Sequence, residues 1–221
     1  TAMVSFVVLT GVVLTACGSQ KEESKTTKKE TLVVGVDDTF VPMGFRDEDN
    51  ELTGFDIDYA RAAAEHMGVE VEFQPIDWKT KENEISSDRI DLIWNGYTIT
   101  PEREEKVDFT KPYLENAQVV AVLEDSEIET LDDLEGEVVG SSALDALEAN
   151  PIYEKIGTLT EFADNVLALS DLKSGRVEAV VIDEVAIDYY MSKEEGTFRL
   201  LEESLAPEQY GVGVKKGNTS L

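Results

Sequence analysis

Short apolar runs alternate with helical patterns along this chain, and this alternation constrains the fold more than any other feature. The expected strands are residues 31–37, 69–75, 90–94, 118–123 and 179–182. The expected helices are residues 56–67, which end at Gly68, and a helix from Asp183 to about Lys193. Strands that alternate with helices in this way predict an α/β architecture with mostly parallel sheets.

The second half of the chain repeats the plan of the first half. Ser87–Ile93 and Ser174–Val180 match in residue class at most positions. Each segment leads from a helical pattern into a strand pattern. The match predicts two lobes that are built alike, and each lobe would present strand ends, where ligands bind in open α/β sheets.

One strand end carries an unusual set of polar groups. After the strand, a polar turn leads into a helix for which Thr100 is the expected N-cap and Pro101 the first residue. The turn brings together the backbone of Gly96 with free N–H groups, the hydroxyl of Thr98 and the guanidinium of Arg103. A guanidinium has two parallel donors that fit a carboxylate. The segment therefore predicts a carboxylate site, although a lone arginine in a first helical turn is more often a solvated surface residue.

Charge and composition exclude several classes of function. The net charge of −28 argues against nucleic acid as a partner, because proteins that bind nucleic acid are basic. His66 is the only histidine and is expected on the surface or in the last turn of its helix. Together with the single cysteine, it leaves no Ser-His or Cys-His nucleophilic site and no metal-ligand cluster. Gly211–Gly213 lacks the helix that a dinucleotide site requires, so no enzyme activity, metal or cofactor is expected.

The N-terminal segment has the features of an export signal. The apolar run from Met3 to Ala16 is too short to span a bilayer and ends in a sequence that resembles the bacterial lipobox. The resemblance implies that residues 1–17 are a signal peptide, that Cys17 receives lipid, and that residues 18–30 are a flexible tether to the outer face of the cell membrane. The alternative is a buried free thiol in an amino-terminal core helix.

Several motifs in order resemble one known family. They are residues 36–45, 52–58, 94–103, 107–113 and 172–183. The chain resembles the type 2 periplasmic solute-binding proteins of the polar amino-acid uptake family, which are the extracellular receptors of ABC importers. The resemblance implies a bilobal fold in which two hinge crossovers, near Ala117 and Gln209, join two similar lobes. Lobe 1 would comprise residues 31–117 and 209–221, with its C-terminal part truncated at Leu221, and lobe 2 residues 118–208.

The resemblance also implies how an amino acid would be held. Arg103 would bind the ligand α-carboxylate, with help from Thr98 and the backbone of Gly96. Asp183, on the other lobe, would take the α-ammonium, and its alternative role is that of a helix N-cap. Ser141, in a small-residue turn, would add donors to the carboxylate from lobe 2. Ser142, in the same turn as Gly140, would do likewise, although the strand before this turn is shorter than the family pattern.

The walls of the side-chain pocket would come from lobe 1. By resemblance they are Asp37, Phe40 and Trp78. Phe40 and Trp78 could equally be core residues, and Asp37 could simply cap a turn, while Tyr97 is expected to pack rather than to touch ligand. The implied partners are a small-molecule amino acid and the permease subunits in the membrane, with the receptor itself a monomer. The rival functions are a periplasmic dehydratase-like enzyme on the same fold and a sensor input domain.

Overall fold

The computed structural model describes residues 31–141, 147 and 150–218. The signal peptide, Cys17 and the tether expected at the N-terminus lie outside the described residues, as does Ser142. The helices are α1 (Phe55–Met67), α2 (Lys81–Ser86), α3 (Pro101–Lys106), α5 (Asn165–Lys173) and α6 (Glu184–Lys193), with short 3-10 turns η1 (Trp78–Thr80), η2 (Leu131–Leu134) and η3 (Pro151–Glu154). In the described part of the chain, none of the helices has the length and apolar character needed to cross a membrane.

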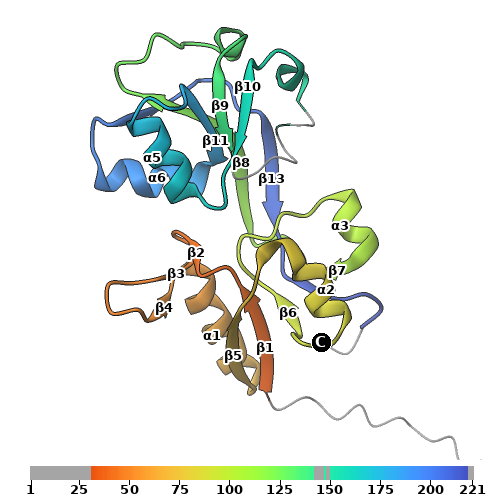
Figure 1. Cartoon of the computed structure of the whole chain (residues 1–221). Helices are drawn as coiled ribbons and strands as arrows, with labels where there is room; N and C mark the ends of the chain where they lie inside the picture. Colours follow the sequence, from red (N-terminus) through yellow and green to blue (C-terminus); the bar gives the residue numbers. More distant parts are fainter. Residues whose placement is uncertain (1–30, 142–146, 148–149, 219–221) are drawn as a thin grey trace, which may run out of the picture.

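Two sheets form two lobes, as the alternating pattern predicted (Figure 1). The sheet of lobe 1 has the order β5-β1-β6-β14-β7, and that of lobe 2 the order β10-β9-β11-β8-β12, with β13 also paired to β8. The lobe 1 strands are β1 (Thr31–Val36), β5 (Glu70–Pro75), β6 (Leu92–Ile93), β7 (Val107–Phe109) and β14 (Gly213–Lys215). The lobe 2 strands are β8 (Leu114–Leu123), β9 (Val138–Ser141), β10 (Thr158–Glu161), β11 (Ala179–Asp183), β12 (Phe198–Leu200) and β13 (Ala206–Tyr210). A small third sheet joins β2 (Thr39–Phe40), β3 (Gly44–Arg46) and β4 (Leu52–Thr53).

Strand direction follows the same plan in both lobes. In lobe 1, β1 runs parallel to β5 and β6, and in lobe 2, β9 runs parallel to β10 and β11. The antiparallel pairs involve β14 in lobe 1 and β8 in lobe 2. The bilobal α/β fold expected from the sequence is therefore confirmed, and the antiparallel strands are those that the chain adds when it passes between the lobes.

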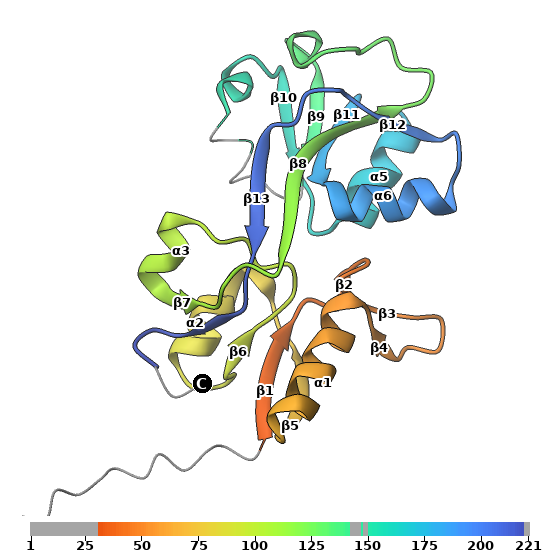
Figure 2. The ribbon, with the colours of Figure 1, turned by 180° about the vertical axis from the view of Figure 1, so that it is seen from behind.

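Two long strands connect the lobes. β8 begins at Leu114, four residues before the strand predicted from the sequence, because residues 114–117 pair with β13. Ala117 lies opposite Pro207, and Glu115 lies opposite Gln209. Figures 1 and 2 show β8 and β13 side by side between the two lobes. They form a two-stranded antiparallel hinge.

The core of lobe 2 lies on both faces of its sheet. Val180 and Ile182 of β11 belong to the cluster under α5 and α6, whereas Ala179 and Val181 belong to the cluster on the opposite face. Alternate residues of a strand point to opposite faces, so a strand covered on both sides reads as one continuous apolar run. This burial explains why β11 was recognisable from the sequence.

The internal repeat predicts the same turn from helix to strand in both lobes, and the structure contains this turn, called the corner below, at residues 87–91 and 174–178. Ser87 is the C-cap of α2 and is followed by Asp88 with φ 59°, while Ser174 is the C-cap of α5 and is followed by Gly175 with φ 69°. Both helices thus end in a left-handed residue that turns the chain toward a strand. The resemblance in sequence reflects one shared backbone conformation.

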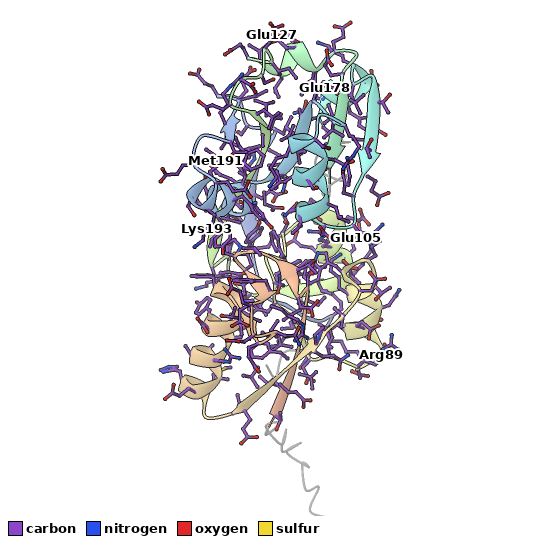
Figure 3. All side chains as sticks on the ribbon, turned by 60° about the vertical axis from the view of Figure 1, so that its left-hand side comes forward. Arg89, Glu105, Glu127, Glu178, Met191 and Lys193 are labelled. Carbon is purple, nitrogen blue, oxygen red and sulfur yellow. The ribbon has the colours of Figure 1, made fainter. Side chains whose placement is uncertain are left out.

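The two corners also tie to their sheets in the same way. In lobe 1, Asp91 N donates to Val33 O at 2.7 Å, and Val33 N donates to the Asp91 carboxylate at 2.8 Å. In lobe 2, Glu178 N donates to Val138 O at 2.8 Å, and Val138 N donates to the Glu178 carboxylate at 3.1 Å. Figure 3 shows Arg89, which lies in the first corner, on the lower lobe and Glu178 on the upper lobe.

Two local expectations need correction. The strand predicted at residues 90–94 is ordered as a strand only at Leu92–Ile93, because β14 and β1 pair with that short stretch alone. The turn predicted at Gly140 and Ser141 is instead the end of β9, where Ser141 pairs with Glu161 of β10 and with Val181 of β11. Ladder hydrogen bonds on both sides of β9 hold these residues in extended backbone.

Candidate functional site

A cleft of about 1100 Å³ lies between the two lobes and is lined by residues of both. Seven of the nine ligand-binding residues predicted from the sequence line it. They are Asp37, Phe40, Trp78, Gly96, Thr98, Arg103 and Asp183. The cleft is at the upper end of the size range of small-molecule sites. Most of the predicted ligand-binding residues therefore lie on the wall of this cleft.

The guanidinium of Arg103 is oriented by its own helix and turn. Thr100 caps α3 as predicted, because its hydroxyl accepts from Arg103 N at 3.2 Å, and Pro101 is the first helical residue. The Arg103 Nη1 donates to the carbonyl of Thr98 at 2.9 Å, and the guanidinium lies over the Tyr97 ring, 5.0 Å from its centroid. Tyr97 is fully buried, so its expected packing role is confirmed. These contacts fix a cation beside the backbone of Thr98 at the cleft wall.

A buried acid holds the turn that precedes Arg103. The Gly96 N–H donates to Asp56 Oδ2 at 2.6 Å, and the Tyr113 hydroxyl donates to the same oxygen at 2.8 Å. Asp56 is fully buried, and this burial raises its pKa to about 6. Gly96 has φ +57°, and a Cβ there would lie 2.4 Å from Phe40 Cε1. The turn therefore requires both the glycine and the acid.

Asp183 ends β11 and faces the cleft from lobe 2. It occupies the N-cap position of α6 but makes no side-chain capping bond, because Val185 N donates to Asn116 Oδ1 at 3.2 Å instead. The Asp183 Oδ1 accepts from Asn116 Nδ2 at 2.9 Å, from Gln118 Nε2 at 3.0 Å and from the Tyr210 hydroxyl at 2.5 Å. The alternative role of Asp183 as a capping residue is therefore wrong.

The partners of Asp183 were not anticipated from the sequence. Asn116 and Gln118 are alternate residues of β8, and Glu208 and Tyr210 are alternate residues of β13. The pairing of these strands places all four side chains near one carboxyl group, and only a polar period-2 pattern in a strand between lobes could have signalled it. Burial, followed by the charge of Glu208, raises the pKa of Asp183 to about 6.

The predicted pocket residues line the cleft and also make structural contacts within the protein. The Asp37 carboxylate accepts from Thr39 N at 2.9 Å and from the Thr39 hydroxyl at 2.7 Å, so it caps a turn while it lines the cleft, and burial raises its pKa. Phe40 packs against the core of lobe 2. Trp78 packs edge-on against Tyr97, with ring centroids 5.8 Å apart, and also lines the cleft.

Among the predicted ligand-binding residues in the described part of the chain, Ser141 is the one that does not line the cleft. It is fully buried in β9, and its carbonyl accepts from Phe162 N at 2.9 Å. Phe162 itself lines the cleft. Within the described residues, no group of three or more His, Cys, Asp or Glu side chains is arranged to hold a metal ion.

Two similar α/β lobes, a two-stranded hinge and a cleft lined by opposite charges from the two lobes define the class of bilobal solute-binding proteins. The chain belongs to the bacterial extracellular solute-binding proteins, family 3, because the model of that family matches residues 32–221. This match covers both lobes and the hinge.

Curated relatives and solved structures agree with this assignment. The L-cystine-binding protein TcyJ of Escherichia coli K12 is 32% identical over 204 residues, which cover 90% of this chain and 76% of TcyJ. The arginine-binding extracellular protein ArtP of Bacillus subtilis is 31% identical over 185 residues, which cover 82% of this chain and 72% of ArtP. These relatives are binding proteins, and neither the enzyme nor the sensor alternative is favoured.

Among solved structures, a Streptococcus pneumoniae substrate-binding protein of an ABC uptake transporter, with bound histidine, has a TM-score of 0.80 and 38% identity and covers 85% of this chain and 80% of its own. An ancestral arginine-binding protein bound to arginine has a TM-score of 0.78 and 37% identity, with 86% of each chain covered. The fold is thus shared with proteins that have been solved with a bound amino acid.

Proposed function

We propose that this protein binds a polar L-amino acid between its lobes and delivers it to the membrane permease of an ABC importer. The observation that carries the proposal is the placement of Arg103 and Asp183 on one cleft but on different lobes. The named relatives bind cystine and arginine, and the named structures hold histidine and arginine. These three ligands share the α-carboxylate and the α-ammonium.

The charges of the cleft suit a zwitterion. Burying an unpaired charge costs several kcal/mol, so each end of a free amino acid needs a charged, hydrogen-bonding partner. Arg103, assisted by the Thr98 hydroxyl, would bind the carboxylate, and Asp183 would bind the ammonium. Because the two partners lie on different lobes, the ligand stabilises the closed form more than the open form, and binding shifts the population toward closure.

The lobe boundaries follow from the hinge. We place the crossovers near Ala117 and Gln209, so that residues 31–117 and 209–221 form lobe 1 and residues 118–208 form lobe 2. Support comes from the position of both residues within the paired strands β8 and β13. Bending of this pair would move Arg103 relative to Asp183.

The remaining pocket residues would contact the ligand side chain. Asp37, Phe40 and Trp78 surround the part of the cleft nearest to β2 and η1 and would exclude water from the charged pairs. Ser141 and Ser142 would contribute from lobe 2 if closure brings the end of β9 to the ligand. Micromolar affinity, on the order of −8 kcal/mol, is expected for such a site.

A lipid anchor at Cys17 would hold the receptor, as a monomer, at the outer face of the bacterial cell membrane. Support comes from the apolar run that precedes Leu14-Thr15-Ala16-Cys17 and from membership of an extracellular family. Growth with a clickable palmitate analogue should label the protein in a bacterial host, and Cys17→Ser should abolish the label. Labelling that survives this substitution would contradict the anchor.

A ligand screen tests the central proposal. The twenty amino acids, cystine and ornithine are added singly, and the thermal midpoint is measured, since a ligand of the native state raises it by mass action. Arg103→Ala should nearly abolish binding of the best ligand in calorimetry, because a buried carboxylate is left without its partner. Arg89→Ala, a lobe 1 arginine outside the cleft, is the matched control. No shift with any amino acid, or an Arg103→Ala affinity within twofold of wild type, would refute the proposal.

A further inference from the structure

Two carboxyl groups at the base of the cleft share one pair of amide donors. The Asn116 Nδ2 donates to Asp183 Oδ1 at 2.9 Å and to Glu208 Oε2 at 3.2 Å. The Gln118 Nε2 donates to the same two oxygens at 3.0 Å and 3.2 Å. Both amides are buried in β8, so they hold the two acids on one side of the hinge. The acids therefore form a pair, although they come from β11 and β13.

The partners of this pair are neutral in the described residues. Beyond the amides, Asp183 accepts from the Tyr210 hydroxyl and Glu208 accepts from the Thr98 hydroxyl at 3.3 Å. The negative charge of Glu208 disfavours the ionisation of the nearby, buried Asp183. This effect adds to burial in raising the pKa of Asp183 to about 6. A cation that reached both oxygens would remove the repulsion.

The other charged groups of the cleft are engaged elsewhere or lie on other elements. Lys79 pairs with Glu161 at 2.7 Å, and Lys81 lies 3.5 Å from Glu82. Arg103 lies over the Tyr97 ring in lobe 1. The further acids on the cleft wall are Asp37, Glu115 and Asp164, and Glu184 follows Asp183 at the start of α6.

We propose that Asp183 and Glu208 together form the ammonium subsite, and that Asp183 gives up its proton to the solvent when the ligand ammonium binds. The inference rests on the proposed function and adds Glu208 to it. No bond other than the O–H of the protonated acid is broken. The positive charge of the ammonium then compensates the negative charge that Asp183 gains.

Glu208 is also placed to couple the two lobes. Its carboxylate bonds Thr98, which belongs to the carboxylate-binding turn of lobe 1, and the amides that hold Asp183 in lobe 2. A ligand ammonium that draws Glu208 toward Asp183 therefore acts on the contact between the lobes. Ligands without a primary α-ammonium would lose this interaction.

Proton release by the wild-type protein is the first test. Calorimetric titrations with L-arginine and L-glutamine are run at pH 5.5 and pH 8.0, each in two buffers of different ionisation enthalpy. We expect release of most of one proton at pH 5.5 and of almost none at pH 8.0, with affinity that rises with pH between these values. The desamino analogues 5-guanidinopentanoate and glutaramate should release no proton from the pair. Binding of the amino acids without proton release at pH 5.5 would overturn the proposal.

A pair of matched variants distinguishes a specific effect of Glu208 from the general effect of removing one negative charge from the cleft. Glu208→Gln keeps the size and one acceptor of the side chain, whereas Glu115→Gln makes the same change in the neighbouring hinge strand, on a residue of the same cleft. At pH 7.5, we expect Glu208→Gln to weaken the amino acids at least tenfold and the desamino analogues less than threefold. It should also reduce proton release at pH 5.5, while Glu115→Gln should leave both quantities near wild type.

The possible failures are distinguishable. Absence of binding by the wild-type protein to any amino acid would refute the proposed function itself. Equal losses for amino acids and desamino analogues in Glu208→Gln would show that Glu208 serves only the hinge, and equal losses in both variants would show a general charge effect. Either result would overturn the acid pair. If Glu208→Gln lowers the thermal midpoint too far for titration, the wild-type proton count decides.

Discussion

The buried acid beneath the carboxylate-binding turn makes stability depend on pH in a direction opposite to that of most carboxylates. Asp56 has a pKa of about 6 in the folded protein against an ordinary value of 3.8. The native state therefore holds its proton more tightly than the unfolded state. By linkage, the stability that Asp56 contributes is full below the unfolded pKa and is lost as the pH rises through the folded pKa. The loss between pH 4 and pH 7.5 is about 2–3 kcal/mol, from 1.36 kcal/mol per pKa unit.

Asp56→Asn isolates this effect, because an amide has nearly the shape of the protonated acid and does not ionise. Urea unfolding of both proteins is measured at half-unit steps from pH 4 to pH 7.5. The free energy of unfolding of the variant minus that of the wild type should rise by about 2–3 kcal/mol across this range. The raised pKa of Asp183 makes the same contribution to the pH dependence of both proteins, so this contribution cancels in the difference. A difference that is flat, or that falls with pH, would refute the reasoning, whatever its value at pH 4.

Three further predictions concern the cleft. Gly96→Ala should lower the free energy of unfolding by about 2–4 kcal/mol in urea, from positive φ and the contact with Phe40; a loss below 0.5 kcal/mol would speak against a fixed turn. Asp183→Ala should weaken an α-amino acid by about 2–5 kcal/mol in calorimetry but its desamino analogue far less; equal losses would contradict its pairing with the ammonium. The Lys79–Glu161 pair crosses the cleft between exposed side chains, so Lys79→Met should change affinity by less than about 1 kcal/mol, and a tenfold change would mean that the pair acts as a latch.

The strength of sequence reasoning here lay in local patterns. Gly68 ends α1 in the left-handed conformation, and Thr100 caps α3, because both roles depend only on neighbouring residues. The exposed position of His66 in the last turn of α1 was confirmed for the same reason. Arg103 was indicated by the turn that follows a strand, and Asp183 by the resemblance to the family, and both line the cleft.

The contacts that were missed depend on residues far apart in the chain. Asp56 and Asp58 stand two residues apart in the same helix and look alike in sequence, yet Asp56 is fully buried and Asp58 is exposed. Nothing local distinguishes them, since the burial of Asp56 comes from Gly96 and Tyr113. Likewise, Glu208 is one acid among many until β13 pairs with β8.

The hinge strands carry a consequence for how such a receptor can be altered. Asn116, Gln118 and Tyr210 donate to the carboxyl group of Asp183 from β8 and β13, the two paired strands that lie between the lobes (Figure 1). A substitution in β8 or β13 would therefore change both the connection between the lobes and the hydrogen bonds to Asp183. A variant designed to stiffen or loosen these two strands should therefore also change the electrostatic environment of the Asp183 carboxyl group.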